Sequence, residues 1–194
     1  MTETIAMGSA PVKPDRPAVA ALRGAYRAAG TAAGLTLLTF AAGLALETIP
    51  AGRNLQKGFA ALDLAARVGA GEDIDPYALC EAYHDEHDEG IEPIAWTYKG
   101  TSHQTAWIPA LCVVGAASWH LSVHRGETPY SQFEDFDSPD AREEACDALN
   151  DVTGVDDAAL SAACAYVKAH GSKAAEGWGR PLRIDELRRA AGRG

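Results

Sequence analysis

Apolar residues recur at helical spacing along most of the chain, and the alternation typical of strands is sparse. Leu55, Phe59, Leu62 and Ala66 fall at i, i+4, i+7 and i+11, which places them on one face of a helix. Alanine, the strongest helix former, is abundant, whereas the strand formers Val and Ile are few. At 194 residues the chain has the length of one domain. We therefore predict an all-α fold, a single-domain helical bundle of about six helices.

Local signals predict where these helices begin and end. Asp75 has the properties of an N-cap, with Pro76 at the first helical position. Gly126 is placed to end the fourth helix, and Pro109 is expected to kink it or to mark its first turns. The six predicted helices cover residues 18–47, 55–70, 75–90, 102–125, 138–150 and 156–171.

The two ends of the chain differ in composition from the predicted bundle, which spans residues 18–171. Residues 1–17 hold three prolines among small polar residues and have no apolar period, so we expect a disordered leader. Residues 172–194 are rich in arginine and are expected to form a basic C-terminal tail with a short helix near 184–190.

The 19 residues from 28 to 46 carry no charge and could just cross a bilayer. Ala, Gly and Thr make up most of them, strongly apolar residues are few, and no second span is available as a partner. We predict a helix buried in the core of a soluble, cytoplasmic protein, with no membrane contact. No signal-peptide layout is present either.

Charge is strongly segregated along the sequence. Residues 72–157 contain 20 Asp and Glu against three Lys and Arg, a net charge of −17, whereas the remaining residues carry a net charge of +7. Such an acidic block repels nucleic acid and anionic membranes and attracts basic protein surfaces or cations. We therefore expect no nucleic-acid binding through the middle of the chain.

The densest part of this block is the run from His84 to Glu89 at the end of the predicted third helix. Carboxylates there oppose the helix dipole, at up to about 1 kcal/mol each. The run is a solvated face, a metal site or a surface shaped for a basic partner. The buried face of that helix is predicted to consist of Tyr77, Cys80, Tyr83 and His87. On the fourth helix one face is predicted to consist of Trp107, Leu111, Val114, Ser118, Leu121 and Arg125, extended by Cys112, Trp119 and Val123.

A helical metalloprotein, or a metal-dependent enzyme, is the alternative that these histidines leave open. His84 and Asp88 form an i, i+4 pair, as do His120 and His124, and facing helices could combine such pairs around Zn, Mn or Fe. Asp85 or Glu86 would then act as the base for bound water. The four cysteines contain no C-x-x-C motif and are expected to be small buried thiols, and no serine-nucleophile or phosphate-loop motif is present.

Three stretches of the sequence resemble a known family: LTLLTFAAGLALETIP, ALDLAARVGAGEDIDPYALCEAYHDEHDEGI and TAWIPALCVVGAASWHLSVHRGETPYSQFED. Over about residues 35–150 their order resembles the all-helical immunity proteins encoded beside bacterial polymorphic toxins, the sixth immunity family. The resemblance implies a protein that binds and neutralises a cognate toxin domain, with no enzyme activity and no cofactor.

Together with the acidic block, the family resemblance predicts a partner-binding surface for a toxin domain that carries a basic face. The residues that we expect to form this surface are Asp85, Glu86, Asp88, Glu89, Trp96, Tyr98, Tyr130, Phe133, Glu134, Asp135 and Phe136.

Overall fold

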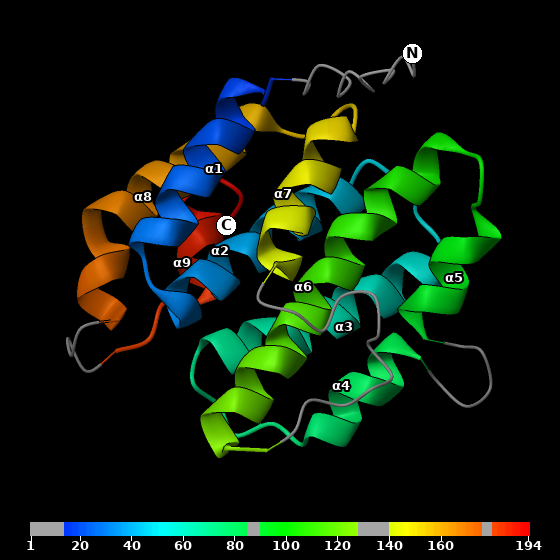
Figure 1. The fold of residues 1–194 in the computed structure, drawn as a ribbon. Coiled ribbons are helices and arrows are strands. Elements are labelled where there is room, and N and C mark those ends of the chain that lie inside the picture. Colours follow the sequence, from blue (N-terminus) through cyan, green and yellow to red (C-terminus); the bar gives the residue numbers. More distant parts are fainter. Residues whose placement is uncertain (1–13, 85–89, 128–139, 176–179) are drawn as a thin grey trace, which may run out of the picture.

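Two apolar helices, α2 (Thr31–Leu46) and α6 (Ser102–Arg125), pack against each other at the centre of the fold (Figure 1). Every residue of α2 except Thr31, Ala32 and Gly43 is buried, as are ten successive residues of α6, from 109 to 118. A helix that is buried on all sides needs neighbours all round. The remaining helices supply them.

The structure, a computed structural model, describes residues 14–84, 90–127, 140–175 and 180–194. In these ranges the chain forms nine helices and no strand, which confirms the all-α prediction and corrects the helix number upward. The other seven are α1 (Pro17–Ala28), α3 (Arg53–Gly69), α4 (Pro76–Tyr83), α5 (Ile91–Thr97), α7 (Ala141–Asp151), α8 (Asp157–Ala175) and α9 (Ile184–Ala190).

The outer helices are divided between the two central ones. α1 packs along α8, and both contact α2, whereas α4 and α5 contact α6 on the other side of the molecule (Figure 1). α3 and α7 each touch both α2 and α6. α9 packs against α2 and α8, with Leu182 and Leu187 inside the same core as the rest of the bundle.

Several of the predicted helix ends are confirmed. The Asp75 carboxylate accepts a hydrogen bond from the Tyr77 backbone N–H at 3.0 Å, and Pro76 is the first residue of α4. Gly126 adopts a φ of 68°, the left-handed conformation that favours glycine after a helix. α6 begins and ends as predicted and continues through Pro109 as one helix.

The predicted helix over residues 18–47 is wrong, because it is two helices. The chain breaks at Gly30, whose φ of 76° and ψ of 174° are accessible to glycine alone. α2 turns back there onto α1, and a Cβ on Gly34 would lie 2.8 Å from the Tyr26 carbonyl oxygen. Small residues therefore permit the close contact between these two helices.

The predicted third helix, over residues 75–90, is also too long, since α4 ends at Tyr83. On its buried face Cys80 and Tyr83 are confirmed, but Tyr77 is 47% exposed and Leu79 fills the core in its place. His87 lies outside the described residues. On α6 the prediction for Val123 is wrong, since this residue is 56% exposed, and Trp119 is half-buried. Arg125, predicted on the same face, is exposed and pairs with Asp73.

α6 is long and apolar enough to cross a bilayer, judged by length and composition alone. However, 78% of its apolar stretch is buried against other parts of the protein, as is typical of a core helix. The uncharged segment around residues 28–46 gives only the 16-residue α2, which is buried in the bundle.

The four cysteines are free and buried, as predicted. Burial raises the pKa of the Cys164 thiol to about 11 and that of Cys146 to about 12, so both stay protonated at neutral pH. A protonated, buried thiol is a poor nucleophile.

Candidate partner-binding surface

Trp96 is the large aromatic side chain that α5 presents to solvent. Ile91, Ile94 and Ala95 hold this short helix to the core, whereas the Trp96 side chain is 48% exposed. Its indole Nε1 donates a hydrogen bond to Glu92 Oε1 at 3.1 Å, one helical turn earlier. The Lys99 ammonium lies 5.8 Å from the ring centroid, within cation–π distance. The exposed ring is therefore held in place at its edge and on its face.

Glu92 connects this ring to the histidine at the start of the acidic run. Its second carboxylate oxygen, Oε2, lies 2.7 Å from His84 Nδ1. One carboxylate therefore orients both an imidazole and an indole, and such a network fixes the positions of all three side chains.

The residues on either side of the acidic run lie next to each other. A Cβ on Gly90 would collide with the backbone of Tyr83 and His84, so the chain at these positions is in direct contact. Gly90 is also the residue from which α5 begins. The two residues that flank segment 85–89, His84 and Gly90, therefore lie next to each other, and His84 contacts Glu92.

Tyr98 has a different environment from Trp96. Its ring is half-buried and stacks on that of Trp107, with centroids 6.3 Å apart and planes inclined by 15°. His103 contacts it edge-on at 5.9 Å. Tyr98 thus covers the core residue Trp107 and offers less of its ring to a partner than Trp96 does.

The nine other residues predicted for the partner surface lie outside the described residues, and their prediction stays untested. They are Asp85, Glu86, Asp88, Glu89, Tyr130, Phe133, Glu134, Asp135 and Phe136.

The histidines proposed as metal ligands are not brought together in the described residues. His84 bonds to Glu92, whereas His120 and His124 stack with centroids 6.3 Å apart on α6. Among described residues no group of three or more His, Cys, Asp or Glu side chains is placed to hold a metal ion. Asp88 is not described. The metal alternative therefore rests on no ligand set in this part of the chain.

Two carboxylates that share a surface pocket with His120 and His124 are already engaged. Glu72 and Asp73 line the same surface pocket as these histidines. Glu72 pairs with Arg67 at 2.8 Å, and Asp73 pairs with Arg125. Burial, followed by the charges of His124 and Arg142, lowers the pKa of His120 below its usual value. The pocket therefore offers a neutral imidazole beside neutralised carboxylates.

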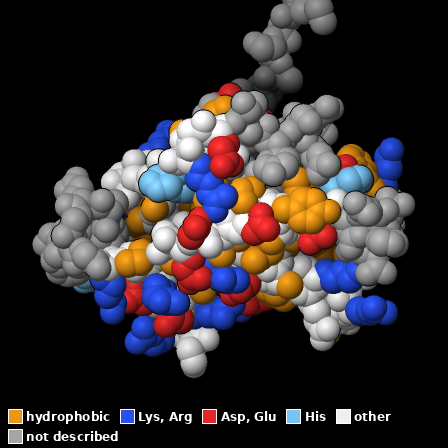
Figure 2. Space-filling model, turned by 90° about the horizontal axis from the view of Figure 1, so that it is seen from below, with side chains coloured by type: hydrophobic (Ala, Val, Ile, Leu, Met, Phe, Trp, Pro, Cys, Tyr) orange, Lys and Arg blue, Asp and Glu red, His pale blue; other side chains and the backbone are white. Residues whose placement is uncertain are grey.

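The acidic block is partly neutralised by basic residues from outside it. Arg183 of the tail approaches Glu72 at 3.8 Å, Arg193 bonds to Asp156 at 2.7 Å, and Arg16 bonds to Asp157 at 3.1 Å. Figure 2 accordingly shows acidic and basic side chains interspersed on one face, with hydrophobic side chains between them. Segments 85–89 and 128–139 hold seven further carboxylates and no Lys or Arg. By sequence, they carry much of the remaining negative charge.

Comparisons of the chain with protein-family models, with curated proteins and with solved structures gave no match. The family resemblance stays a prediction made from the sequence.

Sequence reasoning missed Glu92 as the organising residue, because no helix was predicted between residues 90 and 102. The signal was present. Ile91, Ile94 and Ala95 have the i, i+3, i+4 spacing of a short amphipathic helix, and this spacing puts Glu92 and Trp96 on its outer side.

Proposed function

We propose that this protein is an immunity protein that binds and neutralises a cognate toxin domain, acting by occupation of a surface and without chemistry of its own. The observation that carries the proposal is Trp96, a half-exposed indole fixed by Glu92 and Lys99 beside the acidic run. The resemblance over residues 35–150 supplies the class of partner. The proposed surface combines Trp96 and Tyr98 with the acidic and aromatic residues of 85–89 and 130–136.

The physical argument is that an oriented tryptophan makes an efficient anchor. Tryptophan is enriched among the residues that dominate binding energy, because it buries a large area with few rotatable bonds. Hydrogen bonding to Glu92 already restricts the indole, so less side-chain freedom is lost on association. Such an anchor is expected to govern the rate of dissociation.

The acidic segments support a basic partner. Carboxylates that are not neutralised within the fold attract a cationic surface over about one Debye length and reject anionic partners. A toxin domain with a basic face, as is common for proteins that act on nucleic acid, meets this requirement.

The proposal predicts that a toxin domain is encoded beside this gene, and the test uses that domain. Its expression in bacteria should arrest growth, and co-expression of this protein should restore growth. In a kinetic binding assay, Trp96→Ala should weaken the complex by about 2 kcal/mol or more, roughly 30-fold, mainly through faster dissociation.

The matched control is Tyr166→Ala, an aromatic truncation on α8, which lies on the opposite side of the molecule from α5 (Figure 1). It should leave both rate constants near the wild-type values. If the domain arrests growth equally with and without this protein, the proposed function is wrong. If Trp96→Ala and Tyr166→Ala have equal effects, Trp96 is not the anchor.

A further inference from the structure

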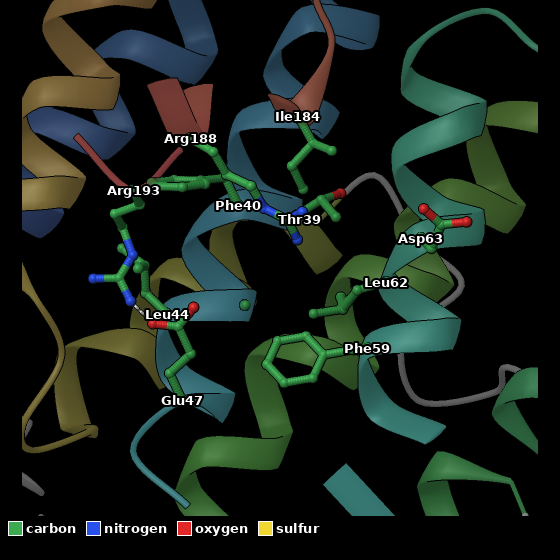
Figure 3. Close-up of a pocket in the computed structure, with 11 residues that line it drawn as sticks. Thr39, Phe40, Leu44, Glu47, Phe59, Leu62, Asp63, Ile184, Arg188 and Arg193 are labelled. Carbon is green, nitrogen blue, oxygen red and sulfur yellow. Dashed lines mark ion pairs between the residues drawn. The ribbon is translucent and has the colours of Figure 1, made fainter. Parts of the chain in front are cut away.

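A pocket of about 400 Å³ opens between α2, α3 and α9, away from the surface proposed for the toxin (Figure 3). Its floor is apolar and consists of Phe40, Leu44, Phe59, Leu62 and Ile184. This volume falls within the range of sites for small molecules, which combine an apolar lining with a few placed polar groups.

Two of the charged residues around the pocket are paired with each other. Arg193 forms an ion pair with Glu47, drawn as a dashed line in Figure 3, and its second nitrogen bonds to Asp156 at 2.7 Å. This arginine is therefore neutralised by two carboxylates, and it closes one side of the pocket.

The other two charges, Arg188 and Asp63, make no hydrogen bond from their side chains and no ion pair with any described residue. Arg188 comes from α9 and reaches into the pocket toward Thr39, whereas Asp63 lies across from it on α3 (Figure 3). Asp63 acts on the Arg67 guanidinium only through space, since Arg67 is bonded to Glu72. A cation and an anion thus face the same apolar floor from two helices.

This arrangement selects among small ligands by charge. A simple carboxylate would pair with Arg188 but would also face Asp63 and Glu47. A simple amine would pair with Asp63 but would face Arg188. A ligand that carries both charges satisfies both residues, and an apolar body attached to it covers the floor.

We propose that this pocket binds a free α-amino acid with a large apolar or aromatic side chain. The ligand carboxylate bonds to the Arg188 guanidinium, the ligand ammonium bonds to Asp63, and the side chain lies against Phe40, Phe59 and Leu62. This site is independent of the toxin surface.

The experiment is a titration of the full-length protein with L-phenylalanine. Binding is measured by calorimetry and by changes in the NMR signals of the Phe40 and Phe59 rings. L-Phenylalaninamide, which lacks the carboxylate, and 3-phenylpropionate, which lacks the ammonium, serve as ligand controls. Each should bind about tenfold more weakly than L-phenylalanine or worse, because one charged partner is left unmatched.

Arg188→Gln should weaken L-phenylalanine binding by a similar factor of about ten. The matched control is Arg189→Gln, one residue along α9, because Arg189 bonds to Asp185 and lines a different pocket. It should leave the affinity within about twofold of wild type. Asp63→Asn should weaken L-phenylalanine but not 3-phenylpropionate.

Binding of all three ligands with equal affinity would overturn the proposal, as would equal effects of Arg188→Gln and Arg189→Gln. The absence of heat and of ring-signal shifts up to the solubility limit of L-phenylalanine would also overturn it. Because Arg188 is exposed, its replacement leaves the core intact, and unchanged thermal unfolding verifies this.

Discussion

A single guanidinium, that of Arg23, joins the segment before α1 to α7. It bonds to Asp15 at 2.7 Å, to Glu143 at 2.6 Å and to Asp147, and its side chain is only 16% exposed. The hydrogen bond to Asp15 has the largest effect on the pKa of Arg23. Together the three hydrogen bonds outweigh the effect of burial and raise this pKa. Tyr26 and Arg27 donate to the same Glu143 carboxylate. Three chain segments, namely the one before α1, α1 itself and α7, are thus joined by one cluster of charges.

This cluster predicts a specific dependence of stability on pH. Burial raises the pKa of Glu143, but hydrogen bonds from Tyr26, Arg27 and Arg23 outweigh it and lower the pKa below its usual value of 4.5. A carboxylate with a depressed folded pKa stabilises the protein fully above its unfolded pKa, and the contribution is lost as pH falls through the folded value. The free energy of unfolding should therefore fall with acidification below about pH 4.5.

Glu143→Gln should be less stable than wild type at neutral pH and should lose less stability on acidification. Urea unfolding between about pH 7 and about pH 3 measures both effects. Glu81→Gln, an exposed substitution on α4, is the control and should follow the wild-type curve. A Glu143→Gln curve that runs parallel to wild type below pH 4.5 would contradict the role assigned to this carboxylate.

At the scale of helices, the sequence predicts most helices and many of their ends. The prediction fails where the effect of a glycine or a proline depends on the surrounding structure. α6 and α9 match their predicted bounds, because Gly126 and the apolar period are local signals. The break at Gly30 was not predicted, because glycine is tolerated inside a buried helix and its φ cannot be read from composition.

α5 was missed because no helix was predicted between residues 90 and 102, where Pro93 lies. Pro93 is the third residue of α5, where a backbone N–H has no partner within the helix, so proline costs little there. The candidate site shows the same limit. Trp96 was predicted to belong to the partner surface, but its hydrogen bond to Glu92 depends on a helix that was not predicted from the sequence.

The contact between α1 and α2 gives a prediction at this scale. A Cβ on Gly34 would lie 2.8 Å from the Tyr26 carbonyl oxygen, which belongs to backbone and cannot move alone. Gly34→Ala should therefore push the two helices apart and lower the free energy of unfolding by about 1–3 kcal/mol, as overpacking does elsewhere.

Gly24→Ala is the matched control on α1. A Cβ there would meet only the end of the Lys168 side chain, at 4.0 Å. Alanine in an exposed helix interior should then stabilise the protein by about 0.5–1 kcal/mol. Opposite signs for the two substitutions in urea unfolding support the close contact, whereas a stabilising Gly34→Ala would contradict it.

At the scale of the whole molecule, folding reduces the charge segregation of the sequence. Arginines from both ends of the chain pair with acidic residues of the middle, among them Glu72, Glu143, Asp156 and Asp157. The negative block was evident from the sequence, but its neutralisation was not, since three of these four pairs join residues more than a hundred positions apart and depend on how the helices pack. The charge available to a partner is consequently smaller and more localised than −17 suggests.

This localisation predicts how the proposed complex forms. Association with the toxin domain encoded beside this gene should be steered by segment 85–89. Its on-rate should fall steeply as added salt shortens the Debye length from about 30 Å to about 8 Å. Asp85→Lys combined with Asp88→Lys should slow association at low salt and flatten this dependence, with little change in the off-rate.

The control is Asp63→Lys combined with Asp185→Lys, which makes the same change in net charge between α3 and α9. A steered encounter requires the first pair to slow association more than the second. If both pairs have equal effects, only the net charge matters, and if neither has an effect, the acidic run is a solvated surface.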